Sequence, residues 1–174
     1  QMVEEAEALA SRAVDGEGGL PDVLCVHDPG WHAGVVGLVA SRLKERWHRP
    51  ALAFARADDE EGALLKGSAR SIPGLHIRDA LAAVDARHPG LVERFGGHAM
   101  AAGLSLRADR LDEFSAALQA VVSAQLSDEQ REAELWSDGE LEPAALTRDL
   151  AERLRLAGPW GQGFPEPVFD GEFE

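Results

Sequence analysis

Two short motifs carry the residue types best suited to binding a phosphate. Residues 96–103 read Gly-Gly-His-Ala-Met-Ala-Ala-Gly, and residues 67–71 read Gly-Ser-Ala-Arg-Ser. Adjacent glycines accept positive φ angles, so we predict a turn at Gly96 and Gly97 that directs backbone N–H groups into an anion-binding concavity. In the second motif, two hydroxyls flank Arg70, whose planar fork can take two phosphate oxygens. Together the motifs predict a pocket for a phosphorylated ligand.

The order of apolar and polar segments predicts an α/β domain in which helices flank a mixed β-sheet. We expect strands over residues 22–26, 51–56, 63–69 and 101–107, and helices over residues 2–14, 33–47, 76–86 and 111–126. This order requires strands of both directions in one sheet. The second helix carries a stripe of small residues, Gly34, Gly37, Ala40 and Ser41. We favour close packing of this stripe on the sheet over direct ligand contact.

Composition and charge fit a protein of a reducing compartment that can still face a polyanion. The 174 residues are 45% hydrophobic, and no apolar run is long enough to span a bilayer. The one cysteine, Cys25, lies among apolar residues, so we predict a core residue and a cytoplasmic protein. The net charge of −14 is uneven, because Asp22 to Arg107 holds 11 Lys and Arg against 10 Asp and Glu. The near-neutral central segment could therefore bind nucleic acid, while the flanks carry most of the negative charge.

The chain divides into three predicted parts. Residues 1–19 are interpreted as the end of a connecting helix with a linker, and residues 20–126 as the α/β domain. Residues 127–174 start with a polar linker and continue with three short elements: a strand and turn at 135–141, a helix at 143–156 and a rigid loop at 158–167. Because these elements supply too few strands for a closed barrel, we expect an excised piece of a longer protein.

Four runs of residues resemble one family. Residues 30–43 (GWHAGVVGLVASRL), 66–72 (KGSARSI) and 96–103 (GGHAMAAG) are similar to the DHH-associated, substrate-binding domain of the RecJ family of single-stranded-DNA exonucleases. Residues 158–167 (GPWGQGFPEP) are similar to the start of that family's OB-fold. The likeness covers essentially the whole chain in the family's order. Ala69 stands where the family often has glycine, which leaves the spacing of the flanking serine and arginine intact.

This resemblance implies the substrate-binding part of a 5′→3′ exonuclease that acts on single-stranded DNA in repair and recombination. It implies two divalent cations, Mn²⁺ or Mg²⁺, held by an Asp-His-His motif in a separate N-terminal domain. No Asp-His-His occurs in this sequence, so we expect this piece to bind no metal and to be inactive alone. The expected partner is a single strand with a 5′-phosphate, with a single-strand-binding protein and a helicase as further candidates. We expect a monomer without membrane contact.

The resemblance also assigns roles to particular residues. Its candidate substrate-binding residues are Ser68, Arg70, Ser71, Gly96, Gly97, His98, Trp31 and His32. Ser68 and Arg70 would hold the 5′-terminal phosphate. The glycine pair and His98 would line the cleft that faces the catalytic domain, with His98 orienting the substrate. Trp31 and His32 could stack on nucleotides or donate hydrogen bonds to them.

Each of these assignments has a structural alternative. Arg70 could instead form a surface salt bridge with the acidic run at residues 58–61, His98 could stabilise its turn, and Trp31 could pack at a helix start. Two functional alternatives also stay open: a non-catalytic nucleic-acid-binding module, and a DHH-family phosphoesterase for short oligonucleotides or cyclic dinucleotides. The run around Trp160 argues against the second alternative, since small-substrate members end without an OB-fold.

Overall fold

The computed structural model describes Ala8 and residues 19–57, 63–133, 136–161 and 163–171. The helix predicted over residues 2–14 and the acidic run at 58–61 lie outside the described residues, Ala8 apart. The contacts divide the chain into two compact units, Gln1–Ala133 and Glu134–Glu174. Each unit is described by itself.

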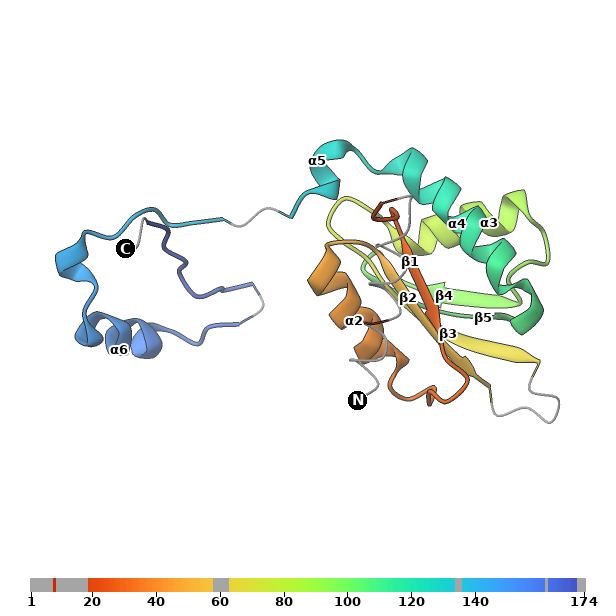
Figure 1. The fold of residues 1–174 in the computed structure, drawn as a ribbon, viewed down its shortest axis with the longest axis horizontal. Coiled ribbons are helices and arrows are strands. Elements are labelled where there is room, and N and C mark those ends of the chain that lie inside the picture. Colours follow the sequence, from red (N-terminus) through yellow and green to blue (C-terminus); the bar gives the residue numbers. More distant parts are fainter. Residues whose placement is uncertain (1–7, 9–18, 58–62, 134–135, 162, 172–174) are drawn as a thin grey trace. The chain divides into compact units, whose positions relative to one another are not determined.

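The first unit is built on a mixed five-stranded sheet, as the sequence predicts. Its strands are β1 (Leu24–His27), β2 (Ala51–Arg56), β3 (Leu64–Arg70), β4 (Arg94–Gly97) and β5 (Ala101–Arg107). They lie in the order β1-β2-β3-β5-β4, and only β1 and β2 run parallel (Figure 1). The sequence did not predict β4. It is a four-residue edge strand that contains both glycines of the expected turn.

Helices cover the sheet on both faces. They are α2 (Val36–Trp47), α3 (Ile77–Arg87), the 3₁₀ turn η1 (Ala108–Arg110), α4 (Leu111–Gln125) and α5 (Asp128–Arg131). α2 packs on β2 and β3, whereas α3 lies across the sheet against α4, β4 and β5 (Figure 1). α2 begins three residues later than predicted, because turns closed by Trp31 and Val35 N–H groups precede it. Among the described helices, none has the length and apolar character needed to cross a membrane.

The side chains of β2 point alternately to the two faces of the sheet, and each face has its own hydrophobic core. Leu52 and Phe54 are fully buried in the core beneath α3 and α4, where the Phe54 ring meets Phe114 edge to face at 6.0 Å. The intervening alanines of β2 are buried in the other core, beneath α2. Alanines let a helix approach a sheet closely, so the small residues of α2 meet small residues of β2. Cys25 packs against the first core, and burial raises the pKa of its thiol to about 12.

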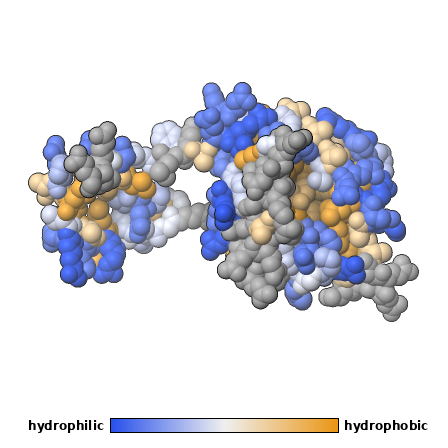
Figure 2. Space-filling view, viewed as in Figure 1, coloured by the Kyte–Doolittle hydropathy of each residue, from blue (hydrophilic) through white to orange (hydrophobic). Residues whose placement is uncertain are grey.

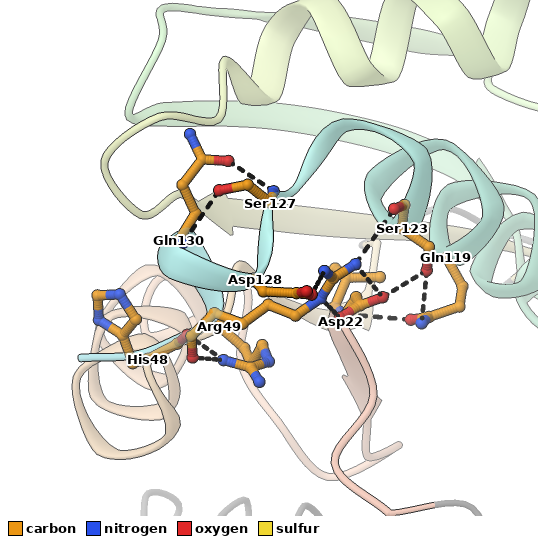
Figure 3. A network of polar contacts seen from close by, with 10 residues as sticks. Asp22, His48, Arg49, Gln119, Ser123, Ser127, Asp128 and Gln130 are labelled. Atoms are coloured by element: carbon orange, nitrogen blue, oxygen red, sulfur yellow. Dashed lines mark hydrogen bonds and ion pairs between the residues drawn. The ribbon is translucent and has the colours of Figure 1, made fainter.

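The polar segment predicted as a linker is partly helical and is tied to the first unit. Ser127 and Gln130 form a capping box that starts α5. Arg131, in the last position of α5, donates from Nε to the Asp22 carboxylate at 2.7 Å. Ser123 of α4 donates to the same carboxylate at 2.6 Å, and Arg49 donates to the Arg131 carbonyl oxygen (Figure 3). This network fixes the point at which the chain leaves the domain.

We predict that Asp22→Asn destabilises the first unit at neutral pH. The hydrogen bond from Arg131 is the main cause that lowers the pKa of Asp22. A lowered pKa means that the carboxylate stabilises the fold above its unfolded pKa, near 4, and that this contribution is lost as pH falls through the folded pKa. Loss of charged hydrogen bonds at this site, only 16% exposed, should lower the free energy of unfolding by about 1.5–3 kcal/mol.

Urea unfolding of wild type and variant at neutral and acidic pH checks this. The difference between them should shrink in acid, because wild-type Asp22 is then protonated as well. Asp128→Asn is the matched control, since Asp128 bonds the same arginine from a fully exposed position and should change stability little. A pH-independent difference would disprove the assigned role of the carboxylate.

The second unit contains η2 (Pro143–Ala145) and α6 (Arg148–Ala157). The helix predicted over 143–156 is interrupted, because Thr147 caps a new helix by accepting from the Leu150 N–H. Trp160 stacks on Phe164 with ring centroids 4.7 Å apart and donates its indole N–H to the Leu154 carbonyl oxygen. In the described part of this unit the expected strand segments form isolated bridges only. α6 has no buried residue, and apolar surface is visible on this unit (Figure 2).

Candidate nucleic-acid interface

Ser68 and Arg70 lie two residues apart on β3, and their side chains meet. Arg70 donates from Nη1 to the Ser68 hydroxyl oxygen at 2.8 Å and to the Ala69 carbonyl oxygen at 2.9 Å. Both side chains are partly exposed. Within the described part of the chain, no acceptor takes the remaining guanidinium donors and no carboxylate pairs with Arg70. The Arg70 guanidinium is therefore held in place, and its remaining N–H groups are available as hydrogen-bond donors.

α2 makes room for this guanidinium through Gly37. A Cβ atom at Gly37 would lie 2.9 Å from Arg70 Nη2 and 3.3 Å from Ser68 Oγ. Gly37 belongs to the first turn of α2, where the helix dipole is positive. The sequence predicted that the small-residue stripe packs on the sheet; Ala40 is buried in the core beneath α2 and Gly37 lies against β3 side chains, whereas Gly34 precedes α2 and is exposed. The stripe also explains why a large cation fits beneath the helix, which sequence reasoning missed.

The acidic run that the salt-bridge alternative for Arg70 requires lies outside the described residues, so that alternative stays open. β3 starts at Leu64, next to the acidic run, and ends at Arg70. Six residues of antiparallel strand separate these two positions by roughly 20 Å. Arg70 itself pairs with Ala51 and Ala101 at the far end of the sheet.

The glycine pair does not form the predicted turn. Gly96 pairs with Gly103, and Gly97 pairs with Ala102, so both glycines lie in a hairpin whose turn is at residues 98–101. The His98 N–H donates to the Ala101 carbonyl oxygen at 2.8 Å and is therefore unavailable to an anion. Gly97 does adopt a positive φ, +146°, and a Cβ there would lie 2.4 Å from the Ala101 carbonyl oxygen. Gly97 is thus required by the hairpin itself.

Backbone hydrogen bonds place His98 in the same row as Arg70. Arg70 pairs with Ala101, and Ala101 accepts from His98, so the three residues follow one another across neighbouring strands. The carbonyl oxygens of Ala99 and Met100 accept from the N–H groups of Ile77 and Ser71. The hairpin tip is therefore fixed to the end of β3 and the start of α3. His98 itself is exposed.

Two predicted contact residues are buried instead. The Ser71 hydroxyl donates to the Leu75 carbonyl oxygen at 2.7 Å, and the residue is 1% exposed. Trp31 is 4% exposed in the core beneath α2, as the alternative of packing at a helix start requires. Neither side chain can contact a nucleotide in this conformation. His32 is exposed, and its Nδ1 accepts from the Gly34 N–H at 3.0 Å.

The described residues do not fit a metal centre. Across residues 19–57, 63–133, 136–161 and 163–171, no three His, Cys, Asp or Glu side chains lie close enough to hold a metal ion. Two-metal hydrolysis needs several converging ligands. The arrangement of Ser68, Arg70 and His98 is instead suited to binding an anion.

Comparison with known proteins identifies the domains. Residues 20–124 match the family model of the DHHA1 domain, and residues 137–174 match that of the RecJ OB domain. The chain therefore belongs to the DHHA1 domain family. The resemblance to RecJ that the four runs indicate is confirmed along nearly the whole chain.

Two similar curated proteins and a similar crystal structure all carry the name RecJ. The chain is 55% identical over 172 residues to the single-stranded-DNA-specific exonuclease RecJ of Dickeya dadantii, and 50% identical over 169 residues to that of Escherichia coli. These matches cover 99% and 97% of this chain but only 29% of each relative. A crystal structure of RecJ from Thermus thermophilus in complex with Mg²⁺ matches with a TM-score of 0.71 and 29% identity, over 97% of this chain and 25% of that one.

Proposed function

We propose that this chain is the substrate-binding part of a RecJ-like 5′→3′ exonuclease and that it grips the 5′-terminal phosphate of single-stranded DNA. The observation that carries this proposal is the Arg70 guanidinium, fixed by Ser68 and free of any carboxylate in the described residues. A strand end that has entered such a site exchanges water for charge-assisted hydrogen bonds.

The chemistry of the site fits a terminal phosphate better than an internal one. A terminal phosphate carries up to two negative charges, and two positive features converge on it here. One is the Arg70 guanidinium, and the other is the first turn of α2 at Gly37, which lies against that guanidinium. The Ser68 hydroxyl accepts from Arg70 and keeps its own proton available for a phosphate oxygen.

His98 is proposed to orient the strand end. It is exposed, and the hairpin places it in the row of Arg70, two strands away. Neighbouring strands lie about 4.8 Å apart, which puts the two backbones roughly 9.5 Å from each other. A nucleotide whose 5′-phosphate rests on Arg70 can therefore present its next phosphate to the imidazole.

Hydrolysis itself is proposed to depend on residues outside these 174. Crystal structures of RecJ relatives hold Mg²⁺ or Mn²⁺, and we propose that a DHH domain of the longer protein supplies such a cation pair. That longer protein is proposed to act in DNA repair and recombination, in the cytoplasm, as a monomer. Its proposed partners are a single-strand-binding protein and a helicase.

Pure chain should bind a 5′-phosphorylated oligothymidylate weakly and should not cleave it with added Mn²⁺ or Mg²⁺. Binding should fall steeply with salt, because few basic groups converge and their contribution is electrostatic. Fluorescence anisotropy measures the binding, gel electrophoresis the cleavage, and calorimetric titration any Mn²⁺ site.

Cleavage that persists through purification, or a stoichiometric Mn²⁺ site, would contradict this division of labour. Absence of binding at low salt would contradict the substrate-binding role. Preferential binding of cyclic dinucleotides would support the phosphoesterase alternative. That alternative is disfavoured by the match of residues 137–174 to the RecJ OB domain.

A further inference from the structure

Within the part of the chain that the structure describes, nothing in the backbone or the neighbouring atoms requires glycine at two positions on the exposed face of the hairpin. Gly96 and Gly103 are cross-strand partners in β4 and β5, and neither has a positive φ. A Cβ atom at Gly96 would meet nothing within 4 Å, and one at Gly103 only the Gly67 carbonyl oxygen at 3.9 Å. Gly97, by contrast, is demanded by its φ and its close contacts. Because strand glycines cost stability relative to alanine, a bare backbone at this point suggests close approach of a ligand.

The two glycines line a shallow, open groove. This groove has a volume of about 370 Å³, and Lys66, Arg94 and Ser105 also line it. Its position follows from the register. Ser68, Gly103 and Gly96 form one row across β3, β5 and β4, and Lys66, Ser105 and Arg94 form the row two residues further along. Directly opposed residues lie on the same face of a sheet, so the groove continues from the Ser68–Arg70 site.

The cations of this groove are exposed and open to a ligand. Among the described residues, neither Lys66 nor Arg94 makes a salt bridge, and both are exposed. Among the described helices, α2 packs on β2 and β3 and makes no comparable set of contacts with β5 or β4. Two residues of antiparallel strand span roughly 6.8 Å, which sets the distance between the row of Ser68 and the row of the two cations.

We infer that this groove binds the sugar–phosphate backbone of the nucleotides that follow the strand end. The open space above Gly96 and Gly103 admits the backbone closely, and Lys66 and Arg94 neutralise its phosphodiesters. This inference rests on the proposed function, since the groove is the continuation of the site for the terminal phosphate. The affinity of such a subsite should depend on the length of the strand and not on its base sequence, because phosphate contacts carry no base information.

The test compares thymidine 5′-monophosphate with 5′-phosphorylated oligothymidylates of increasing length, titrated into the 174-residue chain at several salt concentrations. Wild-type affinity should rise with length. The double variant Lys66→Ala/Arg94→Ala should bind the longer strands roughly tenfold more weakly and the monophosphate unchanged. The slope of log affinity against log salt should also fall in magnitude by about 1.4, because each lost phosphate contact on a single strand contributes about 0.7.

Gly103→Val provides a second, uncharged variant. The space above Gly103 is open and β-branched residues favour strands, so its melting temperature should not fall, while its affinity for the longer strands should. Arg87→Ala, an exposed charge removed from α3 on the opposite face of the sheet, is the matched control and should bind like wild type.

The outcomes separate this inference from the proposed function. If Arg70→Ala leaves monophosphate binding intact, the proposed function fails. If monophosphate binding depends on Arg70 but the double variant retains the length dependence and the salt slope of wild type, only the groove inference is overturned. Wild-type affinity that does not rise with length would overturn it as well.

Discussion

Arg70→Ala should weaken binding of 5′-phosphorylated single strands by about 1.5–3 kcal/mol, the contribution of charged hydrogen bonds. Strands with a 5′-hydroxyl should lose much less, since they lack the group that Arg70 is proposed to hold. The difference between the two strand ends is the informative quantity. A general electrostatic contact would weaken both ends equally.

The measurement is equilibrium binding of matched oligonucleotides that differ only in the 5′ end. Arg42→Ala is the control, because Arg42 lies on α2 and pairs with Glu45 at an exposed position. Circular dichroism confirms that the variants are folded. An equal loss for both strand ends would reject Arg70 as the residue that recognises the end.

In the proposed longer exonuclease, His98→Ala should lower turnover roughly a hundredfold, the effect typical of losing a positioned polar group at a reacting centre. The fold should survive, since His98 is exposed and only its backbone N–H bonds within the hairpin. The reason for the loss is misplacement of the strand end.

Single-turnover cleavage of a 5′-phosphorylated strand checks this prediction, with the melting temperature of the variant as the stability readout. His88→Ala is a matched control, because His88 ends α3 at an exposed position. Wild-type rates in a correctly folded His98→Ala protein would return His98 to the role of a turn residue.

The sequence predicted the layers of the domain well because its helices and strands carry clear periodic patterns. Residues 51–56 were predicted with the bounds that β2 has, since a short apolar run between a proline and an acidic segment is typical of a buried strand. β4 was missed because Gly96 and Gly97 have low strand propensity. Only pairing with β5, which local sequence does not reveal, makes this segment a strand.

The candidate site was predicted in part for similar reasons. Alternation along a strand puts Ser68 and Arg70 on one face, so their proximity could be expected from spacing alone. Ser71 follows the strand, and its burial depends on the bend toward Leu75. Whether Trp31 faces core or solvent depends on the path of the turn before α2. Residue type alone therefore does not determine whether the side chains of Ser71 and Trp31 are buried or exposed.

Long-range polar contacts could not be predicted at all. Asp22 and Arg131 are separated by 109 residues, and no pattern in the chain connects them. The role of Gly37 could be predicted only in part. The small size of this residue was visible in the sequence, but the cation that occupies the space beside it was not.

The end of β3 and the neighbouring hairpin are proposed to bind the 5′-phosphate of a single strand. Nuclear magnetic resonance of the ¹⁵N-labelled chain tests this proposal most directly, in paired titrations with 5′-phosphorylated and 5′-hydroxyl oligothymidylates of equal length. We expect the amide signals of residues 68–70 and 96–98 to shift with the phosphorylated strand and far less with the hydroxyl strand. Equal shifts with both strands, or shifts confined to other parts of the chain, would contradict the proposal.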